Sequence, residues 1–327
     1  MIKKWLLKLG ILLALLPLQA QALLTIEITG GSDGALPIAI VPFGSEGLRP
    51  PEDITKIIRN DLESSGRFAP LEDQDLVSRP TEQSQVNFAD WRLLRSEGLV
   101  IGKISSQDGE NYQVQFQLFD VYRGQQLAGK RYQVPASGLR GLGHQIADVI
   151  YETLTGEKGI FSTRLAFVTQ VTAGDGKKRY ALQISDADGA NPRTILQSTQ
   201  PIMSPAWAPD GDQLAYVSFE NGKSEVFVQQ LQSGQRKSVA AFEGINSAPS
   251  WSPDGRKLAL TLSRNGNPEI YVLELASGDL IRVTNNAQAI DTEAVWSRME
   301  TKFISHRIVV VDHKSIEFLL MVVELNG

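Results

Sequence analysis

The chain contains no cysteine and only three histidines among its 327 residues. The lack of cysteine excludes a disulfide framework, a thiolate nucleophile and any metal site built on cysteine. His144 stands alone on a predicted helix and is interpreted as a surface or packing residue, so the sequence predicts neither a metal site nor a cofactor. The net charge of −5 offers no basic surface for nucleic acid, and we expect no nucleic-acid partner.

An apolar run lies at the N-terminus, and it is too short to span a membrane because Lys8 interrupts it. Lys3 and Lys4 precede the run, and the small residues Ala20 and Ala22 form a cleavage site after it. We therefore predict that residues 1–22 are a signal peptide, cleaved after Ala22. The mature chain is then expected to have no transmembrane segment and to function outside the cytoplasm.

The sequence does contain a repeat built on a tryptophan and a Pro-Asp-Gly turn. The motif reads AWAPDG around Trp207, SWSPDG around Trp251 and VWS around Trp296, so the tryptophans are 44 and 45 residues apart. One tryptophan and one tight turn per unit of this length are typical of β-propellers, in which each repeat forms a four-stranded blade. A β-sandwich is the alternative, because it shares the strand spacing, although not the tryptophan register.

Each unit can be followed strand by strand. After the turn at Trp251 come the strand RKLALTLS, the turn RNGNP, the strand EIYVLEL, the turn ASGD and the strand LIRVT. The unit at Trp207 follows the same order, and an earlier partial unit begins near Arg164. Pro, Asp, Asn and Gly at these positions favour tight turns. We predict a partial propeller over residues 160–297.

A different kind of sequence precedes the repeats. Residues 36–43 form an apolar run that predicts a buried strand, and Pro50-Pro51 open a predicted helix with acidic residues in its first turn, which ends at Gly66. The other predicted elements are a short helix, a strand, a long hairpin and an amphipathic helix, at residues 87–97, 99–106, 112–134 and 139–154. The predicted fold class is therefore α+β, with a small α/β domain over residues 34–156 followed by an incomplete all-β propeller.

The order of these parts resembles the TolB family of the Tol–Pal envelope system, over residues 1 to about 297. The resemblance implies a six-bladed propeller, of which about three blades are present here. It implies a periplasmic adaptor that is not an enzyme, and that supports constriction of the outer membrane at cell division and integrity of the envelope. In that family the propeller binds the lipoprotein Pal and is exploited by colicins, and the mature N-terminus binds TolA.

Site residues follow from the resemblance at two places. The extended segment, residues 23–33, holds the positions assigned to TolA, which are Leu23, Leu24, Thr25, Ile26, Glu27 and Ile28. Such a segment can bind by strand addition, and the alternative is an edge strand of the α/β domain. The loops that enter the innermost strands are assigned to Pal, with Ala248, Thr292 and Glu293. Ala294 departs from the family, in which proline often follows the Thr-Glu pair.

Two further motifs suggest other chemistry. Residues 30–34 match GxSxG around Ser32, but a nucleophile elbow joins a strand to a helix, and here a strand follows. The segment Asp186-Ala187-Asp188-Gly189 lacks the later acidic ligand of a calcium loop and is interpreted as a hairpin turn. The alternative function is the propeller of a truncated prolyl-oligopeptidase-like hydrolase, and the DNA beyond Trp296 discriminates between the two.

The repeat stops abruptly after Trp296-Ser297, where Pro-Asp-Gly is due and the chain reads Arg298-Met299-Glu300. Codons compatible with these three residues encode Pro-Asp-Gly when they are read one base upstream. Synonymous codons beyond them restore a strand, a Gly-Pro turn and an Ile-Tyr strand in register with residues 253–278. We therefore interpret residues 298–327 as an aberrant tail produced by a frameshift, and we expect an open arc of blades rather than a closed ring.

Overall fold

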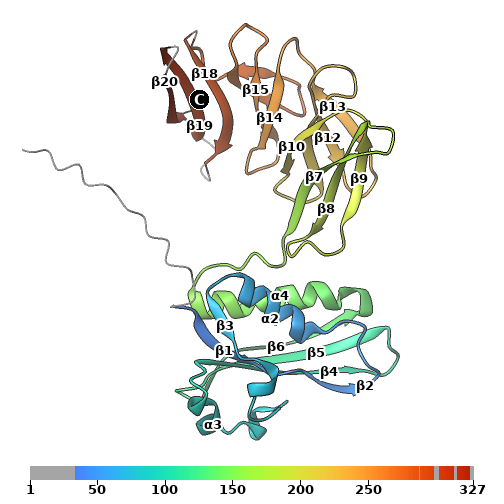
Figure 1. Cartoon of the computed structure of the whole chain (residues 1–327), viewed down its shortest axis with the longest axis vertical. Helices are drawn as coiled ribbons and strands as arrows, with labels where there is room; N and C mark the ends of the chain where they lie inside the picture. The colour runs from blue at the N-terminus through green and yellow to red at the C-terminus, as the bar shows by residue number, and fades with distance from the viewer. Residues whose placement is uncertain (1–33, 287, 298–301, 313–314, 325–327) are drawn as a thin grey trace, which may run out of the picture.

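The computed structural model describes residues 34–286, 288–297, 302–312 and 315–324. The predicted signal peptide, the extended segment 23–33 and Ser32 of the GxSxG match lie outside the described residues. The described part has an α/β domain followed by a series of antiparallel sheets that succeed one another along an open arc (Figure 1). None of the described helices has the length and apolar character needed to cross a membrane.

The α/β domain is built on one mixed sheet in the order β3-β1-β4-β5-β6, with β2 paired to β4. Its strands are β1 (Leu36–Ile40), β2 (Gly44–Gly47), β3 (Phe68–Pro70), β4 (Gly98–Ser106), β5 (Asn111–Asp120) and β6 (Gln125–Pro135). Its helices are α2 (Ile54–Ser64), α3 (Phe88–Leu93) and α4 (Leu139–Thr155), with short 3-10 turns at Asp73–Asp75, Gln83–Gln85 and Ala136–Gly138. The sequence had predicted all three helices and the central strands, but neither β2 nor β3.

Helix α2 begins later than the sequence indicated. Asp53 is the N-cap, and its side chain accepts a hydrogen bond from the backbone of Lys56 at 3.1 Å. Pro50 and Pro51 lie before the helix, and the first turn contains no acidic residue. An aspartate that caps the first free amide groups defines the start more strongly than the two prolines, because a cap satisfies backbone donors that proline cannot.

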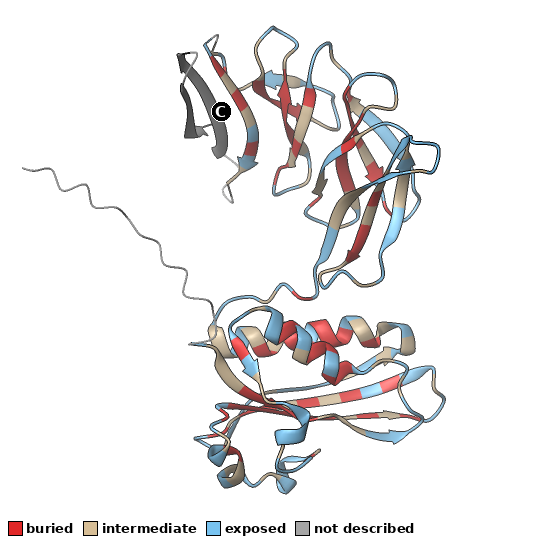
Figure 2. Ribbon diagram, viewed as in Figure 1, coloured by how far each residue is buried: buried red, intermediate tan, exposed pale blue. Residues whose placement is uncertain are grey.

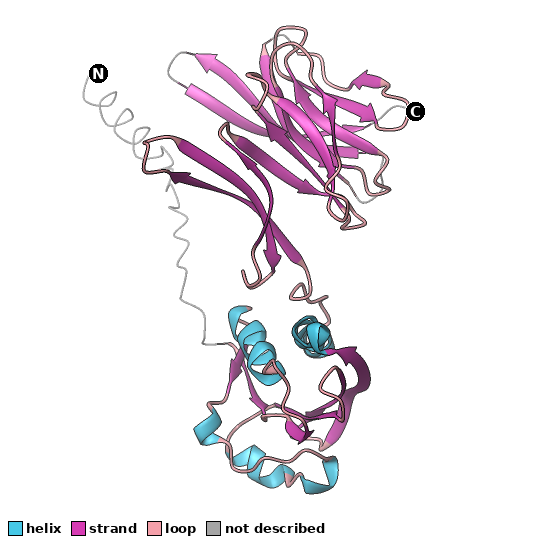
Figure 3. Ribbon diagram, turned by 90° about the vertical axis from the view of Figure 1, so that its right-hand side faces the viewer, coloured by secondary structure: helices cyan, strands magenta, loops and turns pink. Residues whose placement is uncertain are grey.

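The sheet of the α/β domain is covered on both faces, so it has two cores. Helices α2 and α4 pack on one face around Ile58, Phe116 and Ile146, and lie between the sheet and the propeller strands (Figures 1 and 3). On the other face the fully buried Trp91 of α3 packs with Phe119. Figure 2 shows the buried residues concentrated along these faces. The domain therefore completes its own core.

The propeller strands form four successive sheets of three, four, four and three strands. The first holds β7 (Arg164–Thr172), β8 (Lys178–Asp186) and β9 (Arg193–Ser198), and the second holds β10 (Ile202–Trp207), β11 (Gln213–Ser218), β12 (Glu225–Gln230) and β13 (Arg236–Ala240). The third holds β14 (Asn246–Trp251), β15 (Lys257–Leu262), β16 (Glu269–Glu274) and β17 (Leu280–Arg282), and the fourth holds β18 (Ala289–Trp296), β19 (Lys302–Asp312) and β20 (Ser315–Glu324). The predicted units match these sheets.

The repeated tryptophan joins each sheet to the one before it. Trp251 Nε1 donates to the carbonyl of Ala206 at 3.1 Å, and Trp296 Nε1 donates to the carbonyl of Ser250 at 3.0 Å. Each acceptor is the residue that precedes the tryptophan of the previous repeat. Trp207 Nε1 is buried with no partner among the described residues, and the guanidinium of Arg164 lies 4.7 Å from its ring centre.

Residues 298–327 are the segment that the sequence predicted to be an aberrant tail, and no strands were predicted within it. Strands β19 and β20 lie within them, and β19 pairs antiparallel with β18 from Ala289 to Trp296. The absence of Pro-Asp-Gly does not prevent strands from forming here. Strand formation depends on β-branched and apolar residues, which the segment 308–311 supplies. The segment therefore adds strands to the fourth sheet.

Candidate partner-binding surface

The first strand of the second, third and fourth sheets carries the same irregularity. Ser204, Ala248 and Glu293 have positive φ angles of 50°, 49° and 54°, and each lies three residues before the repeated tryptophan. The register of pairing with the next strand shifts at each of these positions. Left-handed backbone is uncommon for residues other than glycine, and such strain concentrates at functional sites. We call these three positions the bulge row.

Two predicted Pal-type positions lie in the bulge row, and the third is adjacent to it. The sequence had placed Ala248 and Thr292 in loops, whereas the structure places them inside strands β14 and β18. The reason is that a bulge interrupts the ladder and exposes strand residues as a loop would. Glu293 is exposed, and Ala248 and Thr292 are partly exposed.

Contacts across neighbouring sheets bring these residues together. Thr261 of β15 lies opposite Ser247, the neighbour of Ala248, in the third sheet. Its hydroxyl lies 3.2 Å from the Thr292 hydroxyl and accepts a hydrogen bond from the backbone of Glu293 at 3.2 Å. Ala248, Thr292 and Glu293 therefore form one continuous surface, held in place through Thr261.

Ser204 was not predicted from the sequence; it occupies the corresponding bulge of β10 and is exposed beside the exposed Met203. The constant offset of three residues before the tryptophan would have identified it. The predicted TolA-type positions Leu23, Leu24, Thr25, Ile26, Glu27 and Ile28 lie outside the described residues.

A second group of polar residues lies where the α/β domain meets the first sheet. His144 of α4 is buried, and its Nδ1 lies 2.7 Å from the carboxylate of Asp61 on α2. The guanidinium of Arg140, one turn earlier on α4, binds the carboxylates of Asp186 and Asp188, with 3.0 Å between Arg140 Nε and Asp186 Oδ2. Both aspartates belong to the predicted β8–β9 hairpin turn, so this turn also bonds the two domains together.

His144 is therefore not a surface residue, which corrects one half of the sequence interpretation, and it is paired with Asp61 within the core. The hydrogen bond to Asp61 raises the pKa of His144 above its usual value, and burial raises the pKa of the Asp61 carboxyl. The two groups lie 83 positions apart in the sequence, and no local pattern pairs them.

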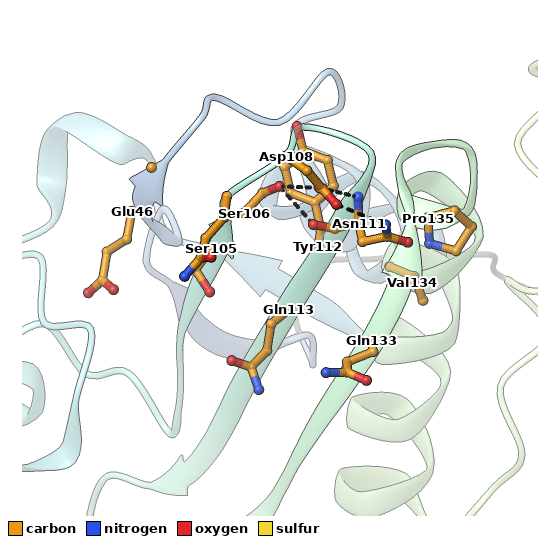
Figure 4. Close-up of a pocket in the computed structure, with 12 residues that line it drawn as sticks. Glu46, Ser105, Ser106, Asp108, Asn111, Tyr112, Gln113, Gln133, Val134 and Pro135 are labelled. Atoms are coloured by element: carbon orange, nitrogen blue, oxygen red, sulfur yellow. Dashed lines mark hydrogen bonds between the residues drawn. The ribbon is translucent and has the colours of Figure 1, made fainter.

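A polar cleft of about 740 Å³ lies at the edge of the α/β sheet where β4 turns into β5 and β6 ends (Figure 4). The Asp108 carboxylate accepts hydrogen bonds from the backbone amides of Glu110 and Asn111 at 2.9 and 2.8 Å. These bonds, first of all those from Asn111, lower the pKa of Asp108 to about 2. A carboxylate held in this way stabilises the turn and is unsuited to act as a general base near neutral pH.

Comparisons with known proteins agree with this architecture. The profile of the TolB amino-terminal domain matches residues 24–127, and that of the TolB beta propeller domain matches residues 151–307. The Tol-Pal system protein TolB of Nitrosococcus oceani is 65% identical over 227 residues, which are 69% of this chain and 52% of that protein. The corresponding protein of Thioalkalivibrio sulfidiphilus is 53% identical over 241 residues, 72% of this chain and 55% of that protein.

The solved structures give a similar result. The crystal structure of TolB from Acinetobacter baumannii superposes with a TM-score of 0.78 at 37% sequence identity, and covers 92% of this chain and 74% of that chain. The chain spans about half the length of the curated relatives it matches.

Proposed function

Because the chain belongs to the TolB family of Tol-Pal system proteins, we propose that it is a periplasmic adaptor without enzymatic activity that links TolA to the lipoprotein Pal. In this role it supports constriction of the outer membrane at cell division and the integrity of the envelope. The propeller strands contact Pal, and colicins compete for the same surface. The extended N-terminal segment contacts TolA.

The observation that carries the Pal part of the proposal is the bulge row. It repeats on three successive sheets at the same distance from the tryptophan, and it combines backbone strain with side chains that are exposed or partly exposed. Strain of this kind persists only where the surrounding structure imposes it, as Thr261 does for Thr292 and Glu293. A rigid and repeated row of this kind suits a preformed surface for another protein, because little ordering entropy is lost on binding.

The first experiment tests this surface with one pair of substitutions. Thr292→Arg places a long cation beside Ala248 and Glu293, and we expect it to weaken binding of purified Pal at least about tenfold, which is 1.4 kcal/mol. Thr194→Arg, on the exposed outer strand β9, is the matched control and leaves the affinity unchanged. Calorimetry measures both affinities. Equal affinities of the two variants for Pal would show that Pal does not bind at the bulge row.

The second experiment separates the two partners. Deletion of residues 23–30 is expected to abolish binding of TolA and to leave binding of Pal measurable, since the deleted segment is distinct from the bulge row. Survival of both interactions after the deletion would show that the proposed division of labour is wrong.

The third experiment tests the location. Fractionation of cells is expected to recover the chain from the periplasm, with Leu23 as the first residue of the mature form. Recovery of an uncleaved chain from the cytosol would contradict the adaptor role, because Pal and TolA could not be reached there.

A further inference from the structure

The junction between the α/β domain and the first sheet holds an imidazole and two carboxylates in an arrangement suited to a metal ion. His144, Asp186 and Asp188 each offer one ligand atom, and these atoms lie within 4.8 Å of one another. His144 comes from α4 of the α/β domain, and the aspartates come from the β8–β9 turn of the first sheet. The group therefore spans the two domains.

The orientation of His144 is the observation that points to a ligand. Its side chain is only 3% exposed, and Nε2 is buried without a hydrogen-bond partner among the described residues. Nε2 lies 4.0 Å from Asp188 Oδ2, which is beyond hydrogen-bond range but close enough for both atoms to reach one ion with a small shift. A buried imidazole nitrogen without a partner costs free energy, so we expect a ligand to bind to it.

The other ring nitrogen has the kind of partner that a metal-bound histidine usually has. Nδ1 lies 2.7 Å from the buried Asp61 carboxylate, and in the neutral tautomer with the proton on Nδ1 the lone pair of Nε2 faces Asp188. Metal-bound histidines usually donate their second N–H to a carboxylate, which fixes the ring and raises its basicity. Asp61 would serve as this supporting carboxylate.

The charges of the group also suit a cation. The three carboxylates of Asp61, Asp186 and Asp188 outnumber the two neighbouring cations, which are the guanidinium of Arg140 and the ammonium of Lys158 in the adjoining cleft. Arg140 holds the two turn aspartates in place, and Asp186 uses only Oδ2 in its hydrogen bonds within the described residues, which are with Arg140 and Asn191. Oδ1 of Asp186 can therefore turn to an ion without the loss of these bonds.

A cleft of about 360 Å³ between the domains reaches the site at Asp188, one of the three proposed ligands. Asp61 and Asp188 line it, together with the linker residues Lys158, Gly159, Ile160 and Phe161. The side chains of Asp186 and Asp188 are about one third exposed, at 32% and 33%. An ion can enter along this cleft, and water in it can supply the fourth ligand.

We propose that His144, Asp186 and Asp188 bind a divalent ion of the zinc type, with Asp61 supporting the imidazole, and that this ion fastens the α/β domain to the first sheet. One imidazole and two carboxylates with a water molecule match the preferred tetrahedral set of Zn²⁺. Ca²⁺ and Mg²⁺ prefer oxygen ligands only and bind weakly here. The site does not depend on which partner binds the bulge row.

The test uses the 327-residue chain without an affinity tag and stripped with a chelator. Calorimetric titration with Zn²⁺ is expected to show one ion per chain, and Co²⁺ is expected to give the visible absorption bands of a tetrahedral site. Asp188→Asn is expected to weaken Zn²⁺ binding at least about tenfold, and Asp61→Asn about 10- to 100-fold. Asp186 and Asp188 are partly exposed and do not belong to a hydrophobic core, so we expect the Asp188→Asn variant to fold.

Asp175→Asn is the matched control, because Asp175 is a turn aspartate of the same sheet, its side chain is 48% exposed, and it lies at the opposite end of β8 from Asp186. Its variant is expected to bind Zn²⁺ as the unmodified chain does. No binding of Zn²⁺, equal binding by the Asp188 and Asp175 variants, or Ca²⁺ binding as tight as that of Zn²⁺ would each overturn the proposal.

A separate measurement tests the fastening of the domains. Limited proteolysis within residues 156–163, which join the two domains, is expected to slow when Zn²⁺ is added to the unmodified chain, and to be unaffected by Zn²⁺ in the Asp188→Asn variant. An equal change in both would show that the ion acts elsewhere.

Discussion

The two regions of the molecule obtain their stability in different ways. Trp91 of the α/β domain is fully buried among residues of its own domain, against a sheet covered on both faces. Trp251 of the propeller region packs in a core shared by the second and third sheets and hydrogen-bonds to Ala206 of the preceding sheet. The α/β domain therefore forms one self-contained unit, whereas each propeller sheet depends on its neighbour, as in other repeat architectures.

The largest expected effect comes from removing one tryptophan from each region. Trp91→Ala and Trp251→Ala should each cost about 3–5 kcal/mol, the range for a buried aromatic residue replaced by alanine. Trp91→Ala is expected to unfold the α/β domain only, whereas Trp251→Ala loosens the second and third sheets together. Urea unfolding followed by limited proteolysis measures both. Loss of a single sheet in the Trp251 variant would contradict the dependence between neighbours.

A smaller effect is expected from the helix cap that the sequence placed too early. Asp53→Ala removes the acceptor for the backbone of Lys56 and should destabilise the α/β domain by about 1 kcal/mol. The unfolding of the propeller sheets should not change. Glu63→Ala, on an exposed position of the same helix α2, is a suitable comparison, because the Glu63 side chain does not cap the helix start. Equal losses in the two variants would argue against the cap.

The strain of the bulge row can be released with a single substitution. Ala248→Gly relieves a left-handed conformation that costs an L-residue about 1–2 kcal/mol, and this gain is partly offset by the entropy of glycine in the unfolded chain, about 0.5–1 kcal/mol. We expect a net stabilisation of about 0.5–1 kcal/mol by urea unfolding. Ala259→Gly, in the regular strand β15, should destabilise instead. Destabilisation by both would mean that Ala248 is unstrained.

The smallest expected effect concerns the stability of the α/β domain at low pH. The pKa of Asp108 is lowered to about 2, so its ionised form stabilises the β4–β5 turn at neutral pH, and the contribution is lost as the pH falls through about 2. Asp108→Asn should therefore lower the stability of the α/β domain at pH 7 and leave it unchanged near pH 1. Carbon-detected NMR titration of the Asp108 carboxyl is the direct check. A midpoint near 3.8 would show that the hydrogen bonds of the turn do not lower the pKa of Asp108.

Much of the fold could be predicted from the sequence, because its patterns are local. The spacing of Trp207, Trp251 and Trp296 predicted the successive sheets, and apolar periodicity predicted α4. The short strands β2 and β3 escaped prediction because both are held by parallel pairing with distant strands and not by their own sequence. The strands β19 and β20 escaped it because the interpretation relied on a missing turn.

The site was predicted only in part, for a similar reason. Ala248 and Thr292 were assigned through the resemblance of their segments to the TolB family, but their conformation depends on a shift of register against β15 and β19, which the sequence does not reveal. The pairing of His144 with Asp61, and the reach of Arg140 to Asp186, join residues that are distant in the sequence. Such contacts are determined by how the domains pack.

The most direct test of the account is a hydrogen-exchange footprint of purified Pal on the chain. The account predicts protection at residues 202–206, 245–249 and 291–294, which contain the bulge row, and unchanged exchange in the strands and helices of the α/β domain. A footprint confined to the α/β domain, with the bulge row unaffected, would contradict it.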